Sequence, residues 1–153
     1  MLYLDSSVLV KRYVQEAGSS LINSRFECGE VIYTSMLTFA EVHSALGRMY
    51  RDKQLSENEK KKLVNEFTND WLFSLTVLDV STSTMTALPR LCELYSLKAS
   101  NAVQLSAALW LKNNNRLRAK SPGAGLGTLE FGVSDRQLAE AALRSGFKIF
   151  NPA

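Results

Sequence analysis

The sequence has few of the residues that build disulfide-bonded, collagen-like or low-complexity chains. It contains two cysteines, three prolines and eight glycines in 153 residues. Cys28 and Cys92 lie far apart with no second metal ligand nearby, which suits reduced thiols in a protein core better than a disulfide framework or a zinc knuckle. The small number of glycines and prolines excludes collagen-like and low-complexity chains.

Long apolar runs are also missing. No run reaches the roughly 18 apolar residues that a membrane-spanning helix requires. The apolar residues 1–4 are interrupted by Asp5, and the basic residues Lys11 and Arg12 follow them rather than precede them, which is the reverse of a signal peptide. We therefore expect a soluble protein in the cytoplasm.

The composition of the chain indicates a folded domain. Hydrophobic residues make up 46% and charged residues 22%, which excludes a disordered chain. The length predicts one domain, residues 1–153, that buries roughly 68–70% of the surface of its unfolded chain. The net charge of +3 permits a polyanionic partner but does not require one.

Predicted strands alternate with predicted helices along the chain. The expected strands are 1–4, 30–35, 73–80, 129–133 and 147–150, and the expected helices are 8–13, 19–28, 38–52, 56–70, 81–95, 102–111 and 136–145. Pro89 should kink or restart the helix over 81–95. Such alternation predicts an α/β fold with a mostly parallel central sheet.

A basic stretch interrupts this pattern late in the chain. Residues 112–120 contain four cations and no acid, and a glycine-rich run over 121–127 follows them. We interpret this part as a basic helix end followed by a mobile loop inside the domain.

Acidic residues stand where predicted strands end or the following helices begin. Asp5 ends the first strand, Glu41 opens the helix after the second, and Asp135 ends the fourth. Asn101 has a comparable place at the start of an apolar helix. Because ligands bind outside the carboxyl ends of parallel strands, we expect these four side chains to converge.

Helix capping is the alternative explanation for each acid. Thr38 and Glu41 have the spacing of a capping box, 134–137 has the same spacing beside Asp135, and Asp5 can cap the first helix. Each cap contributes about 1 kcal/mol. Taken together, however, three carboxylates at one edge repel one another, and a divalent cation relieves that repulsion.

Two other chemistries of acidic pockets fit the residues poorly. Phosphatases of the haloacid dehalogenase type need a second aspartate two positions after the first, where this chain has Ser7. A receiver domain needs a neighbouring pair of acids after its first strand, and this pair is missing.

The sequence resembles PIN domains, and most closely the VapC-type toxins of bacterial and archaeal toxin–antitoxin pairs. The resemblance covers nearly the whole chain, and it rests on the order and spacing of motifs at 2–11, 38–42, 97–109, 134–139 and 146–152. It implies a three-layer α/β/α fold and a ribonuclease that depends on Mg²⁺ or Mn²⁺.

The family's acidic quartet corresponds by position to Asp5, Glu41, Asn101 and Asp135, with Ser6 as a hydroxyl support. The resemblance implies that Asp5, Asn101 and Asp135 hold the metal and that Glu41 orients the attacking water. Asn101 departs from the pattern, because the family usually has aspartate there. Asparagine keeps an oxygen ligand but loses one negative charge, so metal affinity and activity should fall.

The partners implied by the resemblance are RNA, a small VapB-type antitoxin that covers the acidic groove, and a second copy of the chain. Basic side chains must hold the RNA, and we favour Arg12, Lys112, Arg116 and Arg118 for this role. The lysines at 60–62 are more simply a solvated helix face, and His43 is structural because it points to a different face of the helix from Glu41.

Asn101 keeps a second hypothesis open. A catalytically silent PIN domain that binds RNA or protein would tolerate the loss of the acid. The sequence does not distinguish this binding module from an active ribonuclease.

Overall fold

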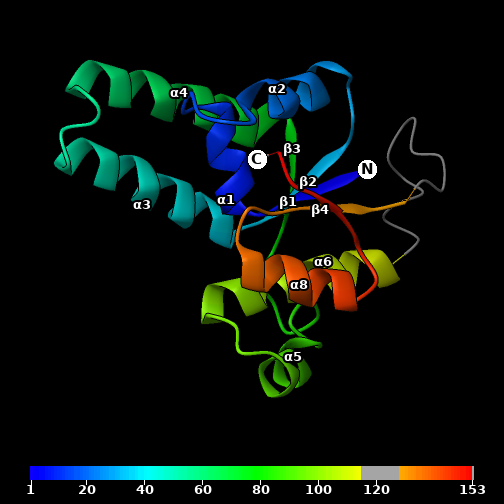
Figure 1. Cartoon of the computed structure of the whole chain (residues 1–153). Coiled ribbons are helices and arrows are strands. Elements are labelled where there is room, and N and C mark those ends of the chain that lie inside the picture. The colour runs from blue at the N-terminus through cyan, green and yellow to red at the C-terminus, as the bar shows by residue number, and fades with distance from the viewer. Residues whose placement is uncertain (115–127, 153) are drawn as a thin grey trace.

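Five parallel strands form the centre of the molecule, which the computed structural model describes over residues 1–114 and 128–152 (Figure 1). The strands are β1 (Leu2–Leu4), β2 (Ile32–Ser35), β3 (Leu75–Leu78), β4 (Glu130–Gly132) and β5 (Lys148–Phe150). Their spatial order is β3-β2-β1-β4-β5, with every neighbouring pair parallel. This arrangement confirms the predicted α/β class.

Helices cover both faces of the sheet (Figure 1). One layer holds α1 (Ser6–Leu9), η1 (Val10–Arg12), α2 (Ser19–Glu27), α3 (Leu37–Arg51) and α4 (Glu57–Phe73), and the other holds α5 (Leu88–Leu94), α6 (Ala99–Asn113) and α8 (Arg136–Arg144). The helices α3 and α4 extend together beyond the sheet as an arm. The three-layer α/β/α architecture that the resemblance implies is therefore present.

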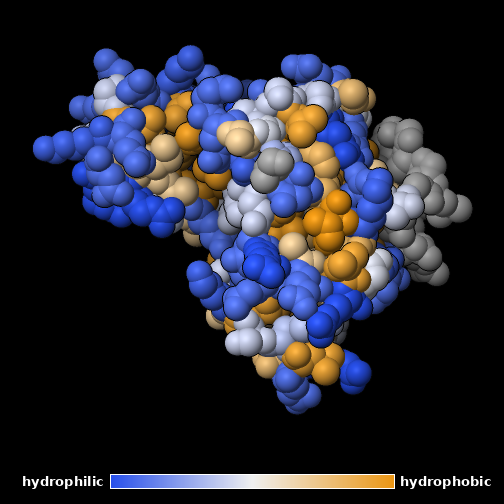
Figure 2. Space-filling view, viewed as in Figure 1, coloured by the Kyte–Doolittle hydropathy of each residue, from blue (hydrophilic) through white to orange (hydrophobic). Residues whose placement is uncertain are grey.

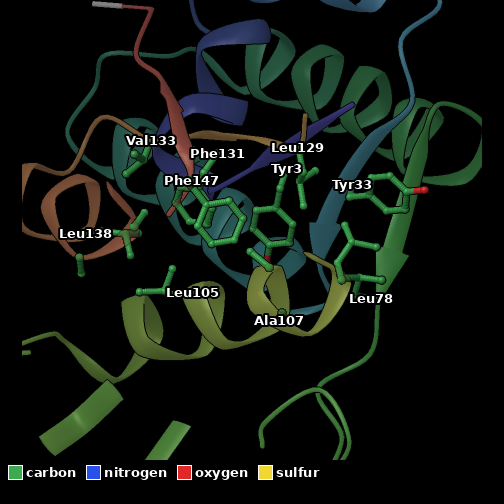
Figure 3. Close-up of a cluster of buried hydrophobic side chains, with 14 of the residues drawn as sticks. Tyr3, Tyr33, Leu78, Leu105, Ala107, Leu129, Phe131, Val133, Leu138 and Phe147 are labelled. Carbon is green, nitrogen blue, oxygen red and sulfur yellow. The ribbon is translucent and has the colours of Figure 1, made fainter. Parts of the chain in front are cut away.

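The alternation of side chains along β1 divides the core in two. Leu2 and Leu4 point into the cluster beneath α1, α3 and α4, whereas Tyr3 points into the cluster against α6 and α8. Figure 3 shows Tyr3 beside Phe131 over α6, and the two rings stack with their centroids 5.3 Å apart. Since all three residues of β1 are fully buried, the strand is anchored on both faces and fixes the position of Asp5, which follows it.

The helix predicted over 81–95 is wrong in its first half. Residues 82–87 form turns, which Thr84 holds by accepting a hydrogen bond from the Ser81 amide and donating one to the Asp79 carbonyl. The helix begins only at Leu88, so that Pro89 lies in its first turn. The missing N–H of a proline costs nothing there, because that position has no partner within the helix.

The two capping boxes expected at Thr38 and at 134–137 do not form. The helix that carries Glu41 begins at Leu37, so Thr38 lies inside it, whereas a capping box of Ser56 and Glu59 begins α4. At α8 the cap is Asp135 itself, which accepts a hydrogen bond from the Leu138 amide. Capping therefore does not account for the place of Glu41.

Both cysteines are free thiols, as expected, but Cys28 and Cys92 are exposed rather than in the core. The predicted basic helix end beyond Asn114 and the glycine-rich loop at 121–127 lie outside the described residues. None of the helices that the structure describes is both long and apolar enough to span a bilayer.

The first prediction concerns Gly18, which has a positive φ of 89° at the start of α2. A Cβ there would lie 1.5 Å from the Pro152 carbonyl oxygen. We expect Gly18→Ala to lower the free energy of unfolding by more than the roughly 1–2 kcal/mol that a left-handed conformation alone costs. Gly29→Ala is the matched control, since Gly29 has a φ of 67° and open space around it. Equal losses in urea unfolding would contradict the backbone collision.

Candidate active site

Asp5 lies at the carboxyl end of β1 and is almost fully buried, with 3% of its surface exposed. Its Oδ2 accepts hydrogen bonds from the backbone amide of Ser7 at 3.0 Å and from the Ser7 hydroxyl at 2.6 Å. The same Ser7 oxygen accepts a bond of 3.0 Å from the Ser134 amide. Ser7 therefore connects Asp5 to the segment that leads into Asp135.

Asp135 lies beside this connection, at the start of α8. One of its oxygens, Oδ1, accepts a 2.8 Å hydrogen bond from the Leu138 amide, and the side chain is half-buried. Asp135 therefore does cap α8, but the cap uses only one of its two carboxylate oxygens. Because Asp5 donates its own amide to the Gly132 carbonyl at 2.9 Å, the ends of β1 and β4 are held together.

Glu41 faces Asp5 from the first turns of α3. Burial raises the pKa of Asp5 from its ordinary 3.8 to about 6, the hydrogen bonds from Ser7 oppose this rise, and repulsion from the Glu41 carboxylate adds to it. The two acids are therefore neighbours, although they are 36 positions apart in the sequence. Glu41 Oε2 accepts a 2.8 Å hydrogen bond from Gln104 on α6, which holds the carboxylate from its inner side.

Asn101 lies in the first turn of α6 and is buried, with 9% exposed. Within the described part of the chain, two buried side-chain polar atoms have no hydrogen-bond partner, and they are the Asn101 amide nitrogen and the Ser134 hydroxyl. Such atoms are rare in folded proteins and call for an explanation such as a bound ion or ligand. One of them belongs to the proposed quartet, and the other precedes Asp135 directly.

A pocket of about 510 Å³ opens beside Glu41 between α1 and α3. Figure 2 shows the outline of the molecule indented between the arm of α3 and α4 and the layer of α6 and α8. Eight residues line the pocket: Ser6, Ser7, Val10, Ala40, Glu41, Ser44, Ala45 and Arg48. It combines an acid, three hydroxyls and a cation, which suits a polar ligand.

The donor set fits a hard divalent cation. Asp5 and Glu41 interact, Asp135 follows the neighbouring strand β4, and Mg²⁺ and Mn²⁺ prefer carboxylate oxygen donors. No three Asp, Glu, His or Cys side chains in residues 1–114 and 128–152 gather closely enough to form a metal cluster by themselves.

Two of the expected RNA contacts lie elsewhere. Arg12 forms a two-point ion pair with Asp70 on α4 and lies 3.9 Å above the Phe26 ring, so it lines a different pocket. Lys112 donates to the Ser145 carbonyl at 3.1 Å and to the Gly146 carbonyl at 2.7 Å, beyond the end of α8. Neither cation reaches the pocket beside Glu41, and Arg116 and Arg118 lie outside the described residues.

Three further expectations can be compared with single contacts. Ser6 was expected to support Asp5 through its hydroxyl, but the hydroxyl that bonds Asp5 is that of Ser7, and Ser6 lines the pocket beside Glu41. His43 packs against the rings of Phe39 and Phe67, with centroid distances of 4.5 and 5.5 Å. Within the lysine run, Lys61 and Lys62 form exposed ion pairs one helical turn away, as expected for a solvated face.

Three residues of this site were not predicted from the sequence, namely Ser7, Gln104 and Arg48. Gln104 is fully buried and contacts Glu41, and its signal was a long amide side chain in an otherwise apolar helix. Arg48 lines the pocket two helical turns after Glu41, and that spacing places both on one face of α3.

Comparisons with known proteins agree on the fold. No family model matches the chain. Ribonuclease VapC45 of Mycobacterium tuberculosis (strain CDC 1551 / Oshkosh) is 27% identical over 109 residues, which are 71% of this chain and 75% of that protein. Among solved structures, FitAcB from Neisseria gonorrhoeae has a TM-score of 0.63 at 15% identity and covers 99% of this chain and 98% of that one. VapBC2 from Rickettsia felis, bound to a DNA fragment from its promoter, has a TM-score of 0.62 at 12% identity, with the same coverage.

The pKa of Asp5 predicts how stability depends on pH. Because this pKa is raised, the folded protein keeps a proton between about pH 4 and 6 that the unfolded chain releases. The protonated Asp5 therefore contributes fully to the free energy of unfolding below pH 4, and this contribution is lost as the pH rises through 6. The change in the free energy of unfolding is roughly 3 kcal/mol.

Asp5→Asn should remove this dependence while keeping the helix cap, since asparagine caps as well as aspartate. Urea unfolding of both proteins at pH 4 and pH 8, with a chelator present, measures the difference in their free energies of unfolding. We expect the variant to gain stability relative to the parent at pH 8 and to gain none at pH 4. Parallel curves for the two proteins would contradict the assignment.

Proposed function

We propose that the chain is a PIN-domain protein of the VapC type and acts as an endoribonuclease, the toxin of a type II toxin–antitoxin pair. The observation that carries the proposal is the interaction of the Asp5 and Glu41 carboxylates at the end of β1, where Ser7 also joins Asp5 to the segment that leads into Asp135. The match to a ribonuclease over 71% of the chain supports it. RNA in the cytoplasm is the substrate.

The proposed reaction is hydrolysis of an RNA phosphodiester. A bound Mg²⁺ or Mn²⁺ supplies a water of lowered pKa and neutralises charge on the phosphate. Asp5 would be the central ligand of this ion, and Asp135 and Asn101 would hold it directly or through water. Glu41 orients the attacking water from the pocket wall, and the Ser6 hydroxyl supports the substrate side of the pocket.

The raised pKa of Asp5 favours this arrangement. A carboxylate buried beside another acid is costly to ionise, and a cation next to it provides the missing positive charge. Asn101 contributes an oxygen but no charge, so the metal should bind less tightly than in a site with four acids.

Asn101→Asp therefore tests whether the metal is held where we propose. We expect the variant to reach half-maximal cleavage of structured RNA at roughly ten-fold or more lower Mn²⁺, the size of effect that residues around metal sites usually have. Titration of Mn²⁺ in a cleavage assay measures it, with the parent protein as reference.

The same assay separates the enzyme from the alternative, a silent PIN domain that serves as a binding module. Cleavage by either protein supports the ribonuclease. RNA binding by both without cleavage by either would reject the ribonuclease and favour the module.

A VapB-type antitoxin and a second copy of the chain are the proposed protein partners. The support is the likeness in fold to VapBC2 and FitAcB over nearly the full length of this chain. Inhibition of cleavage by the antitoxin follows from the proposal, since the acidic groove would be covered.

For RNA binding we propose Arg48 in place of Arg12 and Lys112. Arg48 is exposed and lines the pocket with Glu41 and Ser44, and its guanidinium has no ion pair or hydrogen bond to the described residues. Arg12 and Lys112 already have internal partners. A guanidinium without a partner beside the acidic site is suited to a phosphate next to the scissile one.

Arg48→Gln should raise KM several-fold with little change in kcat. It should also reduce the salt dependence of RNA binding by about 0.7 in log K against log salt, the contribution of one phosphate contact to a single strand. Arg51→Gln is the matched control, because Arg51 is an exposed cation on the same helix outside the pocket. Identical effects of the two variants would show a general charge effect and contradict the assignment.

A further inference from the structure

A buried chain of hydrogen bonds runs from the core to Glu41 through Gln104. The Tyr3 hydroxyl is 2.7 Å from Gln104 Oε1, and Gln104 Nε2 is 2.8 Å from both Glu41 Oε2 and the Thr38 hydroxyl. Thr38 in turn shares a 2.8 Å hydrogen bond with Thr34, which also donates to the Leu4 carbonyl. Tyr3, Thr34, Thr38 and Gln104 are each fully buried.

The direction of this chain follows from the chemistry of its ends. An ionised Glu41 can only accept, so Gln104 must present its NH₂ group to the carboxylate. The second hydrogen of that group points to Thr38, which leaves Oε1 to accept from Tyr3. Tyr3 must therefore donate, and burial followed by the charges of Asp5 and Glu41 raises its pKa well above the ordinary value, which keeps the phenol protonated.

The position of Gln104 explains why one oxygen of Glu41 is engaged and the other is not. Gln104 holds Oε2 from the buried side, whereas no hydrogen bond from the described residues reaches Oε1. Glu41 lines the pocket beside Ser6. The carboxylate is thus fixed in rotation, with one oxygen available to a ligand.

We propose that Gln104 is a positioning residue: oriented by Tyr3, it fixes the Glu41 carboxylate so that the free oxygen faces the water that attacks the RNA phosphate. The inference rests on the proposed ribonuclease and deepens it, since it assigns a role to a residue outside the acidic quartet. Gln104 acts through Glu41 and touches neither substrate nor metal.

The first test is kinetic. Gln104→Leu should lower kcat about ten- to a hundred-fold, the usual effect of losing a group that orients a site residue, and should leave KM and the half-saturating Mn²⁺ within about two-fold. Tyr3→Phe should lower kcat by a smaller factor, and it should have no further effect in the Gln104→Leu background, because Tyr3 acts only through Gln104.

Ser106→Ala is the matched control for lost packing. Ser106 is also fully buried on α6, and it donates a 3.0 Å hydrogen bond to the Thr84 carbonyl, away from Glu41. We expect Ser106→Ala to lower the melting temperature without changing kcat. Equal loss of kcat in Ser106→Ala and Gln104→Leu would overturn the proposal, and so would independent effects of Tyr3 and Gln104.

A second test does not depend on activity. The side-chain amide protons of Gln104, assigned by their loss in Gln104→Leu, should exchange slowly with water in NMR spectra, whereas those of the exposed Gln54 exchange fast. Glu41→Ala and Tyr3→Phe should each shift the Gln104 signals. Fast exchange, or signals that neither variant moves, would overturn the positioning role. Absence of RNA cleavage by the parent protein with slow exchange intact would instead reject the proposed function alone.

Discussion

The structure depends on placing one ionisable carboxylate at the end of a fully buried strand. All three residues of β1 are anchored in the core, so the chain cannot move Asp5 towards solvent without loosening both faces of the sheet. Two hydrogen bonds from Ser7 compensate only part of the burial, and Glu41 adds repulsion. Ionisation of Asp5 is therefore unfavourable in this fold, and a cation at the proposed site would relieve that cost.

Topology explains why distant residues share this edge. In the order β3-β2-β1-β4-β5 the chain first adds β2 and β3 on one side of β1 and then returns to add β4 and β5 on the other side, so the direction of winding reverses between β1 and β4. Crevices at such reversals are where open α/β sheets bind ligands. Asp5 and Asp135 follow the two strands on either side of the reversal, and Glu41 follows β2. The parallel sheet thus gathers acids from three crossings of the chain.

The sequence predicts that these acids follow neighbouring strands, because the strands can be recognised from local patterns. It does not predict which polar side chains form hydrogen bonds or ion pairs with distant parts of the chain. The spacing of Thr38 and Glu41 indicates a capping box, yet Thr38 bonds to Gln104, 66 positions away. Arg12 has no acidic partner nearby in the sequence, yet in the structure it pairs with Asp70, 58 positions away. Lys112 belongs to a basic stretch of the sequence, but in the structure it donates a hydrogen bond to the Ser145 carbonyl at the end of α8. Each error concerns a polar group whose partner comes from another part of the chain.

The two amides of α6 indicate how the site remains stable without metal. Asn101 and Gln104 are three residues apart and so lie on one face of the helix, the face from which Gln104 donates to Glu41 without adding charge. In the proposed site, Asn101 would offer an oxygen without adding a fourth carboxylate. A further acid there would strengthen the grip on a cation, and it would also raise the cost of ionising Asp5 when no cation is bound. In the proposed site, asparagine at position 101 would therefore lower the electrostatic cost of the fold without metal and lower the affinity for the metal, because both effects come from the absence of a charge at that position.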